Sequence, residues 1–133
     1  MNRFRSTRLA GLLIILLGWL LGWATMAHAD DTRFLSVIDD LPLMAGLAEH
    51  PDAALVFDGP TGRIVETYAS GQLSAEAVTG FYAATLPQLG WQPQSGGGYR
   101  RDNEILKLEI GVLATDLSGV RIRFVLKPLE SKP

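Results

Sequence analysis

The last third of the chain contains two segments in which apolar and charged residues alternate. Within residues 104–111, leucine and isoleucine occupy the alternate positions 106, 108 and 110, and a similar apolar series occupies every second position of residues 120–126. The charged positions between them include Lys107, Glu109, Arg121 and Arg123. A period of two predicts strands with one buried and one exposed face, and the turn residues 115–119 predict a connection between them.

Residues 74–89 have the period of a helix instead. An apolar stripe about 100° wide, the width of a core-facing helix surface, is formed by Val78, Phe81, Tyr82, Thr85 and Leu89. Ser74 is a favourable N-cap, and Gly90 is a favourable C-terminal stop. Pro87 is expected to disturb the last turn.

Two apolar runs, 53–57 and 63–69, flank the turn residues 58–62 and predict a hairpin. A further strand is expected at 91–94. Another hairpin is expected at Asp102-Asn103, a two-residue loop that tolerates positive φ.

The predicted fold class is α+β: a two-layer sandwich with one main helix on a mostly antiparallel sheet, in the order β-β-α-β-β-β. The predicted segments are a signal peptide at 1–29, an N-terminal arm at 30–50, an α+β domain at 51–128 and a C-terminal tail at 129–133.

The first 29 residues have the pattern of a secretory signal. Three arginines precede an uncharged run, Leu9–Met26, and Ala27-His28-Ala29 has the small-x-small form of a cleavage site. The expected location is periplasmic or secreted. The alternative is an uncleaved inner-membrane anchor at residues 9–26, a run close to the ~20 residues that span a bilayer.

Composition excludes several functions. Residues 30–133 contain all 14 acidic residues but only 9 of the 12 basic ones, which gives a net charge of −5. This acidic balance argues against nucleic-acid binding. With no cysteine in the chain, a lipid anchor, thiol catalysis and thiolate metal sites are excluded.

The run Val78–Trp91, of the form V-x-x-F-Y, then L, then G-W, resembles a pattern seen in small exported bacterial proteins and lipoproteins of unassigned function. An upstream Pro-x-x-x-Gly stretch, Pro42 to Gly46 here, often accompanies it. The resemblance implies a fold and an envelope location, and no activity.

Candidate ligand-binding residues are Tyr99, Arg100 and Arg101, which follow a glycine-rich link. Two arginines and an aromatic ring are suited to gripping a carboxylate or phosphate. His50 lies near Asp52 and is the histidine available to a hydrolase, but a metal or acid/base site needs more converging groups. We expect no catalytic residue, no metal and no cofactor.

Candidate partner-binding residues lie in the arm, at Leu43, Met44 and Leu47, and on the open sheet face, at Arg121 and Arg123. The small residues Ala77, Gly80 and Ala84 share one flank of the helix. We expect residues 41–47 of the arm to pack there, so that Gly80→Leu would destabilise the fold; the alternative is a partner protein or a second copy of the chain.

The sequence therefore predicts an exported, non-enzymatic envelope protein that binds an unknown envelope protein, and neither nucleic acid nor, unless the leader is retained, membrane. The alternatives are a binder of a small anionic ligand through Tyr99, Arg100 and Arg101, and a hydrolase using His50.

Overall fold

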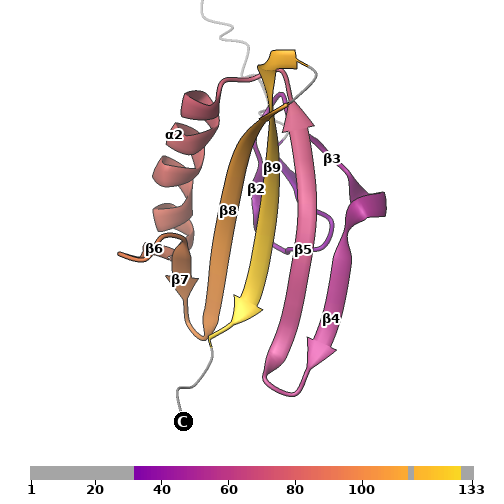
Figure 1. Cartoon of the computed structure of the whole chain (residues 1–133). Helices are drawn as coiled ribbons and strands as arrows, with labels where there is room; N and C mark the ends of the chain where they lie inside the picture. The colour runs from indigo at the N-terminus through magenta and orange to yellow at the C-terminus, as the bar shows by residue number, and fades with distance from the viewer. Residues whose placement is uncertain (1–31, 114–115, 130–133) are drawn as a thin grey trace, which may run out of the picture. The chain divides into compact units, whose positions relative to one another are not determined.

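A computed structural model describes residues 32–113 and 116–129, and its centre is an antiparallel sheet (Figure 1). The predicted leader and nearly all of the predicted tail lie outside these residues. In spatial order the sheet consists of β3 (Ala48–Glu49), β5 (Gly62–Gly71), β9 (Asp116–Pro128), β8 (Glu104–Leu113), β7 (Tyr99–Arg101) and β6 (Gln92–Pro93). β4 (Leu55–Gly59) also pairs with β5, and β1 (Arg33–Phe34) pairs with β2 (Pro42–Leu43) in a separate ribbon.

The predicted α+β class, with one helix on a mostly antiparallel sheet, is confirmed. The predicted order β-β-α-β-β-β is too simple, because three short strands and the 3-10 turn η1 (Pro51–Ala53) precede β4. Strands of two residues are too short to leave an alternating pattern in the sequence. β9 also begins at Asp116, so Gly119, expected in a turn, belongs to a strand.

The sequence explains where the helix begins and where it ends. α2 spans Ala75–Thr85, and the Ser74 hydroxyl accepts a hydrogen bond of 3.1 Å from the amide of Ala77. At Pro87 the chain tightens into the 3-10 turn η2 (Leu86–Leu89). Gly90 then ends it with φ of 85°, in the left-handed region that glycine adopts at helix ends.

The sheet buries one face and leaves the other open. The even-numbered residues 120–126 of β9 and the odd-numbered residues 65–69 of β5 are buried with the helix residues Val78 and Tyr82. Their neighbours on the opposite face are half-buried or exposed, and the predicted Lys107 and Arg121 are exposed. The alternation therefore predicted correctly which residues face the core.

The N-terminal arm is part of the core rather than a free segment. Six of its described residues are buried: Leu35, Ile38, Leu41, Pro42, Leu43 and Leu47. Tyr82 in α2 donates a hydrogen bond of 3.1 Å from its hydroxyl to the carbonyl of Pro42. In Figure 1 the arm, in indigo, lies behind the sheet in the view that presents the open face.

The expected packing of the arm against Gly80 is wrong. Gly80 is exposed, and a Cβ built there would meet nothing within 4 Å. The close backbone approach occurs at Gly71, where a Cβ would lie 2.1 Å from the carbonyl oxygen of Gly46. The arm thus crosses the end of β5, because its leucines are drawn into the sheet core.

Candidate functional site

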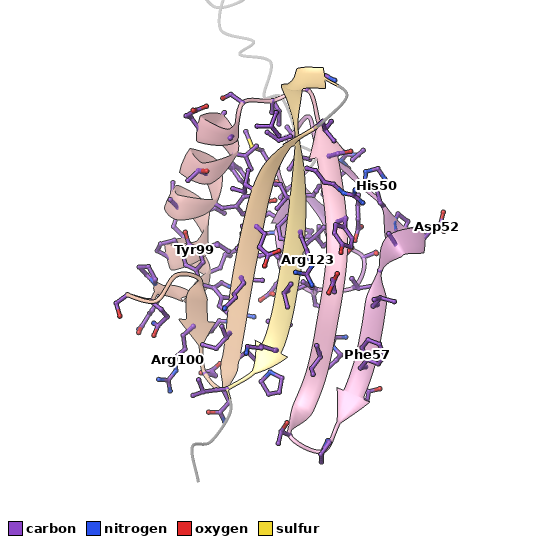
Figure 2. All side chains as sticks on the ribbon, viewed as in Figure 1. His50, Asp52, Phe57, Tyr99, Arg100 and Arg123 are labelled. Atoms are coloured by element: carbon purple, nitrogen blue, oxygen red, sulfur yellow. The ribbon has the colours of Figure 1, made fainter. Side chains whose placement is uncertain are left out.

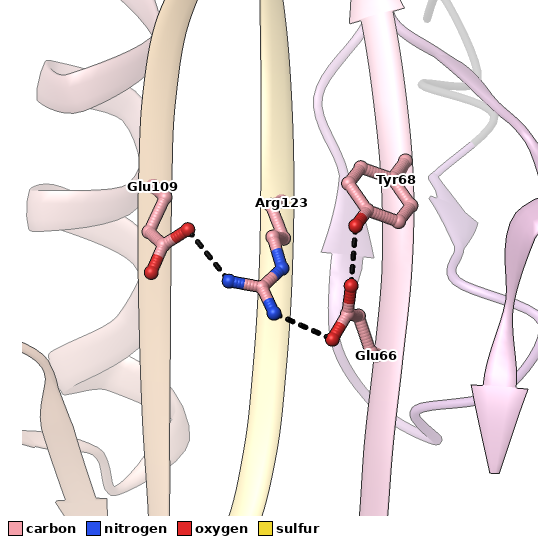
Figure 3. Close-up of polar contacts among 4 residues, drawn as sticks. All are labelled: Glu66, Tyr68, Glu109 and Arg123. Atoms are coloured by element: carbon pink, nitrogen blue, oxygen red, sulfur yellow. Dashed lines mark hydrogen bonds and ion pairs between the residues drawn. The ribbon is translucent and has the colours of Figure 1, made fainter.

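The open face of the sheet contains a polar cluster that spans three strands, drawn in Figure 3. Arg123 on β9 donates to Glu109 on β8 at 2.9 Å and to Glu66 on β5 at 2.6 Å. The hydroxyl of Tyr68 donates to the other oxygen of Glu66. Glu109 could be expected near Arg123 from the sequence, but Glu66 and Tyr68 could not, because the β5–β9 register is a long-range property.

These contacts shift the pKa values of the cluster in the directions that favour the ion pairs. The Arg123 guanidinium and then the Tyr68 hydroxyl lower the pKa of Glu66 from 4.5 to about 2. Donation to Glu66 raises the pKa of Tyr68, and the two carboxylates raise the pKa of Arg123. Each terminal nitrogen of the guanidinium is thus bonded to a carboxylate, and Arg123 links three strands.

The fold buries some of the predicted partner-binding residues and exposes others. Leu43 and Leu47 are 7 % and 1 % exposed, and Met44 is half-buried against the core. These three side chains offer little surface to a partner, because they anchor the arm. Arg121 is exposed on the open face, with its guanidinium 4.8 Å from the centre of the Tyr68 ring.

The predicted ligand-binding residues also lie in different surroundings. Arg101 forms an ion pair of 2.7 Å with Asp40, and its guanidinium lies 4.3 Å from the centre of the Trp91 ring. Tyr99 packs against the core. Arg100 is exposed and lines a cavity of about 560 Å³ together with Arg101, and Tyr99 is not among the lining residues. The three side chains therefore do not converge on one ligand position.

His50 lies beside β5 rather than near converging carboxylates (Figure 2). Its Nε2 and the Ser70 hydroxyl share a hydrogen bond of 2.7 Å, whose donor depends on the histidine tautomer. Asp52 points outward from η1 in Figure 2. Within residues 32–113 and 116–129, no group of three metal-ligating side chains is present.

The edge strand β4 is the feature that sequence reasoning missed. Leu55, Val56 and Phe57 are 50 %, 46 % and 59 % exposed. The apolar run predicted the strand, and the exposure of its side chains is set by the tertiary structure. The hairpin of β4 and β5 extends past the end of the β5–β9 pairing, which begins at Val65, so Phe57, opposite Ile64, receives little cover.

Comparisons with protein-family models, with curated proteins and with solved structures found no match to this chain. In the part of the chain that the structure describes, no helix has the length and apolar character needed to cross a membrane.

Proposed function

We propose that the protein is an exported, non-enzymatic module of the cell envelope that binds an extended segment of another protein along β4. In this proposal the partner adds one strand to the sheet, so that main-chain hydrogen bonds supply affinity and alternate side chains supply specificity. The single observation that supports it most is the exposed apolar edge strand Leu55–Gly59.

The register of the hairpin indicates which backbone groups of β4 are free to pair. Gly59 and Gly62 close a two-residue loop, so they form a hydrogen-bonded pair, and bonded and non-bonded pairs alternate from there. Leu55 and Phe57 therefore pair with β5, whereas the N–H and C=O groups of Val56 and Asp58 point outward. A partner strand would meet these outward groups.

The side chains beside this edge would contact the partner. Leu55 and Phe57 share the open face with Ile64, which lies opposite Phe57 and is 42 % exposed. Soluble proteins usually guard such an edge with charge, proline or a covering element. In β4 the one charged residue is Asp58, next to the turn.

The opposite edge of the sheet differs in this respect. β6 has two residues, Gln92 and Pro93, and a proline cannot donate to a partner strand. β3, on the same side as β4, also has two residues. Among the described strands, β4 is thus the edge best suited to strand addition.

Photo-crosslinking in cells that produce the protein tests this proposal. A photoreactive phenylalanine analogue replaces Phe57, and a matched control places it at Thr79, which is exposed on α2. We expect a discrete protein adduct from position 57 and none from position 79.

A second substitution makes the test specific for strand pairing. Val56→Pro removes the outward N–H but leaves the β4–β5 hydrogen bonds in place, so the adduct at position 57 should disappear. Val56→Thr keeps the N–H and should retain it. No adduct at position 57, or an adduct that survives Val56→Pro, would contradict strand addition at β4.

A further inference from the structure

A pocket lies where the edge of the sheet is interrupted. β3 pairs with residues 69–70 of β5, and β4 pairs with residues 62–66 of the same strand. Between them the chain leaves the edge as η1, and a cavity of about 670 Å³ opens there. This Arg121 pocket is lined by Glu49, His50, Pro51, Asp52, Ala53, Ser70, Leu113 and Arg121.

Arg121 differs from its neighbour Arg123 in the residues placed beside it. The register sets Arg121 between Ser70 and Gly111, whereas Glu109 lies beside Arg123. Among the described residues, Arg101 and Arg123 form ion pairs, and no ion pair of Arg121 is present. Its guanidinium instead lies over the Tyr68 ring, which orients a planar group whose edge donors match an oxyanion.

The opposite wall of the pocket presents further hydrogen-bonding groups in fixed positions. The amide of His50 donates to the carbonyl of Tyr68 at 2.8 Å, and the carbonyl of His50 accepts from Ala53 at 3.0 Å. The imidazole is also hydrogen-bonded to the Ser70 hydroxyl. Ser70 lies directly opposite Arg121 in the β5–β9 register, so a ring N–H, a hydroxyl and a guanidinium border one space.

Two of the lining residues, Glu49 and Asp52, also carry carboxylates. Glu49 accepts hydrogen bonds from Ser36 and Thr67, and Thr67 is a buried residue of the opposite face. Glu109 is paired with Arg123. Asp52 points outward from η1 in Figure 2, and Arg121 is the lining residue whose guanidinium is available to an oxyanion.

We propose that the Arg121 pocket binds the carboxylate or phosphate group of a small molecule. Arg121 forms a two-pronged contact with the oxyanion. Whichever of His50 and Ser70 accepts their shared hydrogen bond keeps a donor that can bind the same oxyanion. The apolar part of the ligand contacts Pro51, Ala53 and Leu113. The volume is within the range of about 300–1,000 Å³ that is typical of small-molecule sites, and the site is separate from the β4 edge.

Titration of the ¹⁵N-labelled protein with two probes tests the proposal. Inorganic phosphate and butyrate are added separately at constant ionic strength, and amide shifts are recorded. We expect saturable shifts of His50, Ser70 and Arg121 with at least one probe. A response to phosphate alone indicates a phosphate ligand, and a response to butyrate alone indicates a carboxylate.

Three variants locate the response. Arg121→Gln should weaken binding at least tenfold, and Arg121→Lys, which keeps the charge but loses the planar fork, should weaken it less. Arg100→Gln removes the same charge at a separate cavity and should leave binding unchanged. The proposal would be overturned by amide shifts that do not saturate, that persist in Arg121→Gln, or that vanish in Arg100→Gln. An unchanged melting temperature confirms that each variant is folded.

Discussion

Gly71→Ala tests the packing of the arm against the sheet. The added methyl carbon would lie 2.1 Å from the carbonyl oxygen of Gly46, 3.1 Å from its carbonyl carbon and 3.3 Å from the Cα of Leu47. All three atoms belong to the backbone, so no side chain can rotate aside. Restoring an ordinary contact of at least 3.0 Å requires a backbone movement of roughly 1 Å.

Such forced shifts in packed regions typically cost about 1–3 kcal/mol. For a domain of this size, each kcal/mol corresponds to about 4–8 °C in melting temperature. We therefore expect Gly71→Ala to lower the melting temperature by at least about 4 °C. Urea unfolding should give a lower midpoint, in agreement with the thermal measurement.

Gly80→Ala is the matched control, since it adds the same methyl group where nothing lies within 4 Å. In an exposed helix interior alanine is favoured over glycine by about 1 kcal/mol, so this variant should melt at a higher temperature than the wild type. If Gly71→Ala were as stable as the wild type, or if Gly80→Ala were the destabilised variant, the position assigned to the arm would be wrong.

Three other measurements test the sheet. The pKa of Glu66 is about 2 in the folded protein, against an ordinary value of 4.5. Its contribution to stability is therefore complete above pH 4.5 and is lost as the pH falls toward 2. The unfolding free energy of Glu66→Gln, measured by urea titration, should depend less on pH in this interval than that of the wild type. Phe57→Pro, which removes a hairpin hydrogen bond, should lower the melting temperature far more than Val56→Pro does, and equal losses would refute the register. Arg101→Ala should cost about 1–2 kcal/mol and alter the fluorescence of Trp91, and an unchanged spectrum would argue against the stacked contact.

The sequence was sufficient to predict those features that depend on local periodicity. The cap at Ser74, the disturbance at Pro87 and the stop at Gly90 follow from residues within one or two turns of each other. The same is true of the turn at Asp102, whose φ is 51°, and of the open face that includes Lys107 and Arg121. Each of these signals is complete within a short segment.

The features that were not predicted depend on contacts between distant segments. The arm has no sustained period, so nothing local shows that Leu43 and Leu47 are buried. Which segment packs against a glycine is likewise determined by the tertiary structure. The sequence therefore predicted close packing at Gly80, whereas the structure has it at Gly71.

The candidate site was predicted less completely than the fold for the same reason. Arg100 and Arg101 are adjacent in sequence, yet only Arg101 has the carboxylate of Asp40 within reach. Arg121 and Arg123 occupy equivalent positions of one strand, and the register alone gives Arg123 its carboxylate partners. The charge pattern of the sequence identified the open face of the sheet. The pairing of the strands, however, determines which of the two arginines has carboxylates beside it.

Hydrogen exchange of the backbone amide of Val56 is the most direct test of β4 as a binding edge. In the isolated protein this amide should exchange rapidly while that of Phe57, one residue along the strand, is protected by pairing with β5. When the partner identified by crosslinking is added, Val56 should become protected and Thr79 on α2 should not change. Exchange at Val56 that the partner leaves unaltered would contradict strand addition as the mode of binding.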